Sequence, residues 1–129
     1  MIGPHEGKEL DLMLAEEKAL AVFHDAVPAE GGMIAETIIP EQAFAPHVVR
    51  GTVKRFAEDI QNVRSGGALR FVCFTLPGEE WRAQFFLWFK REWLGGRQSY
   101  DPSHEYIIGN LLGYTPEDVD DYLRAQKSI

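Results

Sequence analysis

Cysteine, long apolar runs and basic charge are all scarce in this sequence. The single cysteine, Cys73, excludes an internal disulfide, and its apolar neighbours in residues 71–74 predict a buried thiol rather than a nucleophile. The apolar run Phe85–Phe89 is far shorter than the roughly 20 residues that a bilayer span needs, so we expect no membrane contact. The first residues show no basic region followed by an apolar one, so we expect no secretory signal and a cytoplasmic location.

The charge balance argues against nucleic acid as a partner. The sequence has 13 basic and 20 acidic side chains, and its formal net charge of −7 opposes binding to phosphate backbones and to anionic lipid. Its glycine pairs lack the spacing of dinucleotide-binding and P-loop motifs. The sequence therefore predicts no nucleic-acid partner and no cofactor.

Length and composition are those of one globular domain. A chain of 129 residues is at the commonest domain size, and its 45% hydrophobic and 26% charged residues are ordinary for a folded protein. The sequence contains no internal repeat, low-complexity tract or linker. Residues 1–129 are therefore predicted to form a single domain.

Three segments are predicted to be strands. Residues 19–24 are almost wholly apolar and are predicted to form a central strand. Residues 68–76 are rich in β-branched and aromatic side chains up to Pro77–Gly78 and are predicted to form a second strand. Residues 52–63 are ambiguous, because their apolar side chains repeat at helical spacing while Arg64–Gly67 suits a hairpin loop. We assign this segment as a strand, since residues 68–76 need a partner.

The clearest helix is predicted over residues 79–94, which begin with acidic side chains and end at Gly95–Gly96. A short amphipathic helix is expected within residues 6–17. Two further helices are expected at the C-terminus, the second opened by Thr115 and Pro116. We therefore predict an α+β fold, in which a small antiparallel sheet of about three strands packs one face on the aromatic-rich helix, with a C-terminal helical hairpin.

Three patches together carry a resemblance to known proteins. They are Phe44–Gly51, the helix start Pro77–Arg82 with the sequence PGEEWR, and the turn Ile108–Tyr114 with the pattern IGxLLGY. The set resembles small bacterial proteins that carry a strand, a Glu-Trp-Arg helix and a Leu-Gly-Tyr turn in this order. The resemblance covers about half of the chain and implies a bacterial source and a strand over residues 52–60. Those proteins have no established activity, so it implies no catalytic residues.

Histidines that stand next to acids are the candidates for chemistry. Imidazole and carboxylate together can bind divalent metals or relay protons, but no histidine has a partner at metal-ligand spacing, so no metal site is predicted. His24 is the preferred functional histidine because it follows a predicted strand, where active groups are common. The weak catalytic candidates are His24, Asp25, His104 and Glu105.

The aromatic density of the 79–94 helix is the other candidate feature. Six large rings from one helix need cover on more than one side, which the sheet and the terminal hairpin could supply. Alternatively, part of the helix is an exposed aromatic strip at an interface, since tryptophan and arginine are enriched at binding hot spots. Arg82 is also predicted to form an i,i+3 ion pair with Glu79. The interface candidates are Trp81, Arg82, Phe85, Trp88, Phe89 and Trp93.

Three functions follow as hypotheses from these features. The first is a non-enzymatic interaction or regulatory protein that acts through the aromatic helix on a protein partner or by self-association, for example as a homodimer. The second is a small metal-dependent or acid/base hydrolase that uses the His-acid pairs. The third is an inhibitor of immunity or anti-defence type, which is favoured by small size and acidic charge. The sequence leans towards a protein that is not an enzyme.

Overall fold

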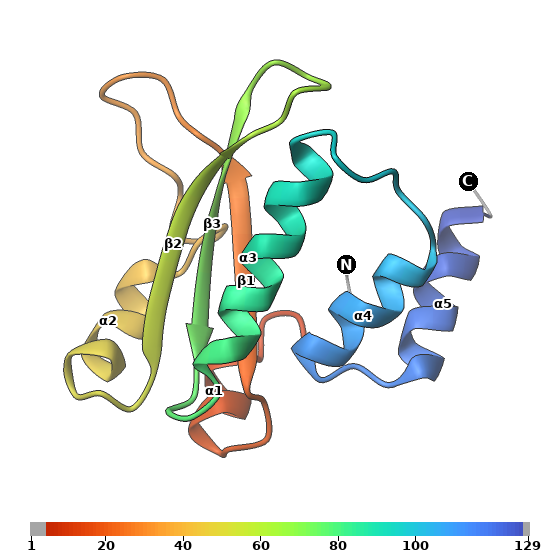
Figure 1. Cartoon of the computed structure of the whole chain (residues 1–129). Coiled ribbons are helices and arrows are strands. Elements are labelled where there is room, and N and C mark those ends of the chain that lie inside the picture. Colours follow the sequence, from red (N-terminus) through yellow and green to blue (C-terminus); the bar gives the residue numbers. More distant parts are fainter. Residues whose placement is uncertain (1–4, 128–129) are drawn as a thin grey trace.

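The computed structural model describes residues 5–127, and this part of the chain forms an α+β fold with five helices and a three-stranded sheet (Figure 1). The predicted fold class is confirmed. Within the described range, no helix has the length and apolar character that a membrane span requires. The elements in chain order are α1 (Glu9–Leu14), β1 (Leu20–Ala26), α2 (Glu41–Val49), β2 (Lys54–Gln61), β3 (Ala68–Thr75), α3 (Glu80–Leu94), α4 (Ser103–Leu112) and α5 (Pro116–Lys127).

The sheet has the order β1-β3-β2, and both pairs are antiparallel. Cys73 of β3 lies opposite Val22 of β1 and Phe56 of β2. The prediction that residues 19–24 form the central strand is wrong. The centre belongs to β3, whose five residues from Phe71 to Thr75 are all buried, whereas the second half of β1 is partly exposed. The strand assignment for residues 52–63 is confirmed, because pairing with β3 outweighs a helical spacing of apolar residues.

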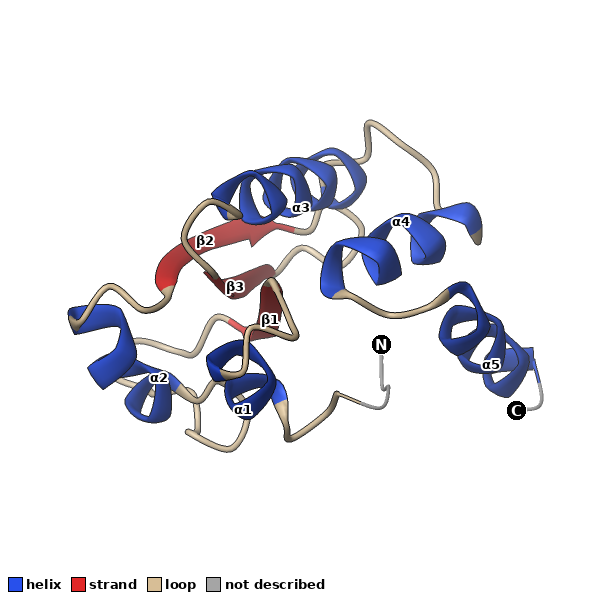
Figure 2. Cartoon of the chain, turned by 90° about the horizontal axis from the view of Figure 1, so that it is seen from below, coloured by secondary structure: helices blue, strands red, loops and turns tan. Residues whose placement is uncertain are grey.

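Helices cover both faces of the sheet, because apolar side chains of β3 alternate between them (Figure 2). Phe71 and Cys73 pack with α3, and Val72 and Phe74 pack with α1 and α2. The expectation of one covered face was therefore incomplete. The core residues on the second face are Met13, Ala21, Ile39, Phe44, Val53, Val72 and Phe74.

Helix α3 lies along one face of the sheet, as predicted (Figure 2). Its buried residues include Ala83, Phe86 and Leu87, which recur at helical spacing and join the core around Phe71. Full burial of one such phenylalanine or leucine side chain stabilises a fold by roughly 1.5–3 kcal/mol. Packing on the sheet thus fixes which side of α3 remains outside.

The last two helices form the predicted hairpin beside α3. Gly113 ends α4 in a left-handed conformation with φ of 87°, which glycine adopts without the steric cost of a Cβ. Thr115 and Asp118 then cap α5 reciprocally. The Asp118 N–H donates to Thr115 Oγ1 over 3.1 Å, and the Thr115 N–H donates to Asp118 Oδ2 over 3.0 Å. This turn places α4 against both α3 and the edge strand β1.

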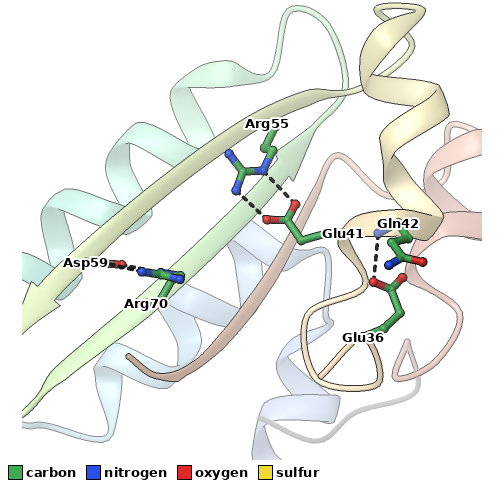
Figure 3. A network of polar contacts seen from close by, with 6 residues as sticks. All are labelled: Glu36, Glu41, Gln42, Arg55, Asp59 and Arg70. Carbon is green, nitrogen blue, oxygen red and sulfur yellow. Dashed lines mark hydrogen bonds and ion pairs between the residues drawn. The ribbon is translucent and has the colours of Figure 1, made fainter. Parts of the chain in front are cut away.

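Polar contacts attach α2 to the sheet on the opposite face (Figure 3). Arg55 of β2 donates to Glu41 of α2 over 2.8 Å, and the Glu36 carboxylate accepts hydrogen bonds of 2.9 and 3.0 Å from backbone N–H groups in the first turn of α2. Arg70 of β3 donates to Asp59 of β2 over 2.8 Å. These exposed ion pairs fix the position of α2 and the strand register more than they add stability.

Candidate functional site

A cavity of about 490 Å³ lies among the edge strand β1, helix α3 and the C-terminal hairpin. This volume is within the range of sites that hold small molecules, roughly 300–1,000 Å³. Apolar side chains such as Val22, Phe71 and Phe86 form much of its wall. The polar side chains that line it include Lys18, His24, Lys90, Tyr100, His104 and Glu105.

His24 reaches this cavity from β1. Its ring stacks on that of Phe71, with the ring centroids 5.3 Å apart and the planes at 25°, although the residue is exposed overall. Contact with the apolar wall lowers the pKa of the His24 imidazole, and the nearby Lys90 charge lowers it further. The neutral imidazole is therefore favoured at pH 7, where it can accept a proton or a hydrogen bond.

His104 and Glu105 reach the same cavity from the start of α4. The His104 ring meets Phe89 edge to face at 4.8 Å between centroids, and the Tyr100 hydroxyl donates to Glu105 Oε1 over 3.5 Å. The fold therefore brings three of the four weak catalytic candidates, His24, His104 and Glu105, to one cavity.

Asp25 is the one catalytic candidate that does not reach the cavity. Its carboxylate accepts a hydrogen bond of 2.8 Å from the next backbone N–H, and it does not line the cavity, since neighbouring residues of a strand point to opposite faces. Within residues 5–127, no three side chains of His, Cys, Asp or Glu converge in a way that could hold a metal ion. The His24–Asp25 and His104–Glu105 pairs therefore do not meet as two pairs.

Lys90 is a cavity residue that the sequence pattern did not single out. Its Nζ lies 5.0 Å from the ring centroid of Trp93, 5.5 Å from that of Phe86 and 6.0 Å from that of Phe71. Burial lowers the pKa of its ammonium, while the charge of Glu105 acts in the opposite direction. The sequence does indicate the position of Lys90, because it follows Phe86 by four residues and so lies on the stripe of α3 that faces the sheet.

Lys18 is a second buried lysine that sequence reasoning missed. Its Nζ donates to the carbonyl of Leu112 and to Nδ1 of His5, and it lies 5.0 Å from the ring centroid of Tyr114. Burial lowers the pKa of Lys18 to about 8. This lysine joins the segment just before β1 to the end of α4, and it lines the cavity.

The reactive groups of the cavity are limited to a few side-chain types. Its described lining contains no serine, threonine or cysteine, and the groups that could act as nucleophiles are the tyrosine hydroxyls, the lysine amines and the carboxylates. Cys73 lies in the core, where burial raises the pKa of its thiol to about 12. Imidazole and carboxylate groups can still transfer protons, but they also serve as hydrogen-bonding partners for a ligand.

A second candidate site is an exposed apolar surface on the outer side of α3 and α4. Trp81 is 51% exposed, Phe85 40% and Trp88 43%, and Tyr106 and Ile107 of α4 are exposed beside them. A shallow hollow of about 370 Å³ lies between the two helices. We call this surface the aromatic face, defined by Trp81, Phe85, Trp88, Tyr106 and Ile107.

Of the other predicted interface residues, Phe89 and Trp93 lie away from the aromatic face, whereas Arg82 borders it, with Cζ 4.7 Å from the ring centroid of Trp81. Phe89 is buried in the core, and Trp93 is half-buried and lines the cavity. Arg82 forms the predicted i,i+3 ion pair with Glu79, with 2.8 Å between Nε and Oε2. Its guanidinium also donates to carbonyls at the end of α4, including that of Leu111 at 3.4 Å. Arg82 thus fixes the spacing of the two helices that carry the aromatic face.

Comparisons with known proteins add no relative to this picture. No protein-family model, no curated protein and no solved structure matches the chain. The two sites are therefore interpreted from their geometry and chemistry.

Proposed function

We propose that the protein acts by binding, as a non-enzymatic interaction protein, and that its aromatic face binds a second copy of the chain. The observation that carries this proposal is the exposure of Trp81, Phe85 and Trp88 on a helix whose opposite side contributes Ala83, Phe86 and Leu87 to the core. A group of large apolar side chains around one hollow is typical of an interaction surface rather than of a monomer's solvent-facing side.

The shape of the aromatic face supports self-association. A two-fold dimer needs one surface that is complementary to itself, with projecting groups that enter a recess of the partner and a recess that accepts the same groups in return. Phe85 and Trp81 contribute to the wall of the hollow, and the exposed Trp88 lies next to it, with its ring centroid 5.8 Å from that of Phe85. One face therefore combines a recess with a large exposed ring beside it, which a second copy of the same face can match.

The distribution of charge on the aromatic face also suits a second copy of the chain as the partner. The chain carries a formal net charge of −7, so two copies repel each other at long range. The described lining of the hollow is uncharged, and it consists of Trp81, Phe85, Tyr106, Ile107, Asn110 and Leu111. An uncharged apolar centre lets two acidic chains come together without burying an unpaired charge.

Light scattering after size-exclusion chromatography tests this proposal. The wild type is expected to elute with twice the chain mass of 14.6 kDa, and the double variant Phe85→Gln/Trp88→Gln with the mass of one chain. Val49→Gln is the matched control, because Val49 is an apolar residue that is 87% exposed on α2, on the other face of the sheet. This control should remain a dimer. A wild-type protein that stays monomeric throughout a concentration series would refute self-association.

A further inference from the structure

The cavity behind the aromatic face is a separate site with its own chemistry. It opens among β1, α3 and the C-terminal hairpin, and its described lining shares no residue with that of the hollow on the outer side of α3 and α4. Aromatic rings of Phe71, Phe86, Phe89 and Trp93 form part of the wall. Such a lining suits a flat apolar molecule more than a sugar or a polar peptide.

Lys90 is a half-buried cation of this cavity that makes no hydrogen bond or salt bridge within the described chain, although the charge of Glu105 acts on it. Its Nζ is in contact range of three rings but donates no hydrogen bond and forms no ion pair with any residue of 5–127. An ammonium group has three N–H donors, and leaving them unmatched in an apolar environment is costly. A ligand that brings an anionic acceptor would satisfy this group.

A second donor in the same wall lacks an acceptor. The indole Nε1 of Trp93 is buried and makes no hydrogen bond, although Trp93 is adjacent to Lys90 through its ring. Buried donors without partners are uncommon in folded proteins and call for a specific explanation. The Nε1 atom itself has almost no accessible surface, so Lys90 is the donor that the cavity presents to a ligand.

The other charges of the cavity limit the charge that the anion can carry. Lys18 is already engaged with Leu112 and His5, and Glu9 and Glu105 add negative charge to the lining. A polyanion such as a nucleotide would meet these carboxylates with only one unpaired cation in return. A ligand with a single negative charge meets less of this repulsion.

We propose that this cavity binds a small aromatic monocarboxylate, with the carboxylate on Lys90 and the ring against the aromatic wall. The site is independent of the aromatic face, so either can exist without the other. In this proposal, His24 and His104 line the same cavity and can form hydrogen bonds with the ligand.

A matched set of three probes tests the ligand class on the wild-type protein. Indole-3-acetate, indole-3-acetamide and tryptamine share one ring system and carry a carboxylate, a neutral amide and an ammonium group. Because a hydrogen bond to a charged group contributes roughly 1.5–3 kcal/mol, the carboxylate should bind about ten- to a hundredfold more tightly than the amide. Tryptamine should bind more weakly still, since Lys90 repels it. Equal affinity for all three probes, tightest binding of tryptamine, or no binding of the carboxylate would overturn the proposal.

The position of the bound probe is read from the indole N–H signals of the protein's three tryptophans in NMR spectra. Indole-3-acetate should shift the Trp93 signal and leave those of Trp81 and Trp88 unchanged. A shift confined to Trp81 or Trp88 would place the probe on the aromatic face and contradict the assignment.

The role of Lys90 is tested by Lys90→Met, which removes the charge and keeps most of the side-chain volume. Lys54→Met is the control, because Lys54 is an exposed residue of β2 away from the cavity. Lys90→Met should weaken binding of indole-3-acetate by about tenfold or more, with little effect on the amide. Unchanged affinity in Lys90→Met would contradict the inference, and the probe series on the wild type decides it if this variant does not fold.

Discussion

Lys18 donates a hydrogen bond from Nζ to Nδ1 of His5 over 2.8 Å, and the same ammonium donates to the carbonyl of Leu112 at the end of α4. One buried cation therefore ties together the start of the described chain, the edge strand β1 and the C-terminal hairpin. Its burial makes the stability of this junction depend on pH.

Lys18→Met should change how stability varies with pH. The pKa of Lys18 is about 8 in the folded protein against 10.5 in the unfolded chain, so between these values the unfolded state holds a proton that the folded state has lost. The free energy of unfolding therefore rises with pH across this window, and below about pH 8 the full cost of the buried charge is present. That cost corresponds to about 3 kcal/mol.

Urea denaturation of the wild type and Lys18→Met between pH 7 and pH 10.5 checks this prediction. The wild type should gain about 3 kcal/mol of stability relative to the variant over that range. Tyr114, whose pKa burial raises to about 12, affects both proteins and acts mainly at higher pH, so it cancels in the difference. Parallel curves for the two proteins would show that Lys18 titrates normally.

Phe44→Ala should be strongly destabilising, because α2 is held on the second face of the sheet by one buried ring. Phe44 is 1% exposed and stacks on Phe74, with the ring centroids 4.0 Å apart. Truncation of a buried phenylalanine costs about 3–5 kcal/mol through lost burial and the cavity left behind. Val49→Ala on the same helix is the control, and it should change the unfolding free energy by less than about 0.5 kcal/mol because Val49 is 87% exposed. Thermal and urea unfolding give both values. Similar small effects would mean that α2 is not packed on the sheet.

Gly113→Ala should weaken the C-terminal hairpin. The backbone φ of Gly113 is 87°, where a side chain costs about 1–2 kcal/mol, although a Cβ would meet only a ring carbon of His5 at 3.7 Å. The expected loss therefore comes from backbone strain and not from a clash. Gly67→Ala is the control, since Gly67 has no positive φ and its Cβ would have only Ser65 Oγ at 4.0 Å. Equal unfolding free energies for the two variants would argue against a left-handed residue at the end of α4.

The elements that were predictable have strong local signals. Residues 68–76 combine β-branched and aromatic side chains up to Pro77–Gly78, and the 79–94 helix ends at a glycine pair, so both boundaries follow from local chemistry. The end of α4 and the start of α5 were likewise readable, because Gly113 and Thr115 have well-defined roles at helix ends. In these segments the tertiary contacts favour the same secondary structure as the local sequence does.

The remaining features depend on contacts between distant segments. Residues 19–24 looked central because they are apolar, but only strand pairing decides which strand has neighbours on both sides. Lys90 looked like a polar surface residue, and only its place over the sheet shows that it lies among aromatic rings. In the same way, His24 and His104 come from a strand and a helix far apart in the chain, and their shared cavity exists only after folding.

Cross-linking from the aromatic face tests the central claim most directly. Gln84 is exposed on α3 between Trp81 and Trp88, and the native Cys73 is buried with a pKa raised to about 12, so a Gln84→Cys thiol is the reactive one. With a short bis-maleimide, Gln84→Cys should give a covalent dimer in high yield. Gln42→Cys on α2, on the opposite face of the sheet, should remain monomeric under the same conditions. A Gln84→Cys protein that stays monomeric, or one that cross-links no better than Gln42→Cys, would contradict self-association through the aromatic face.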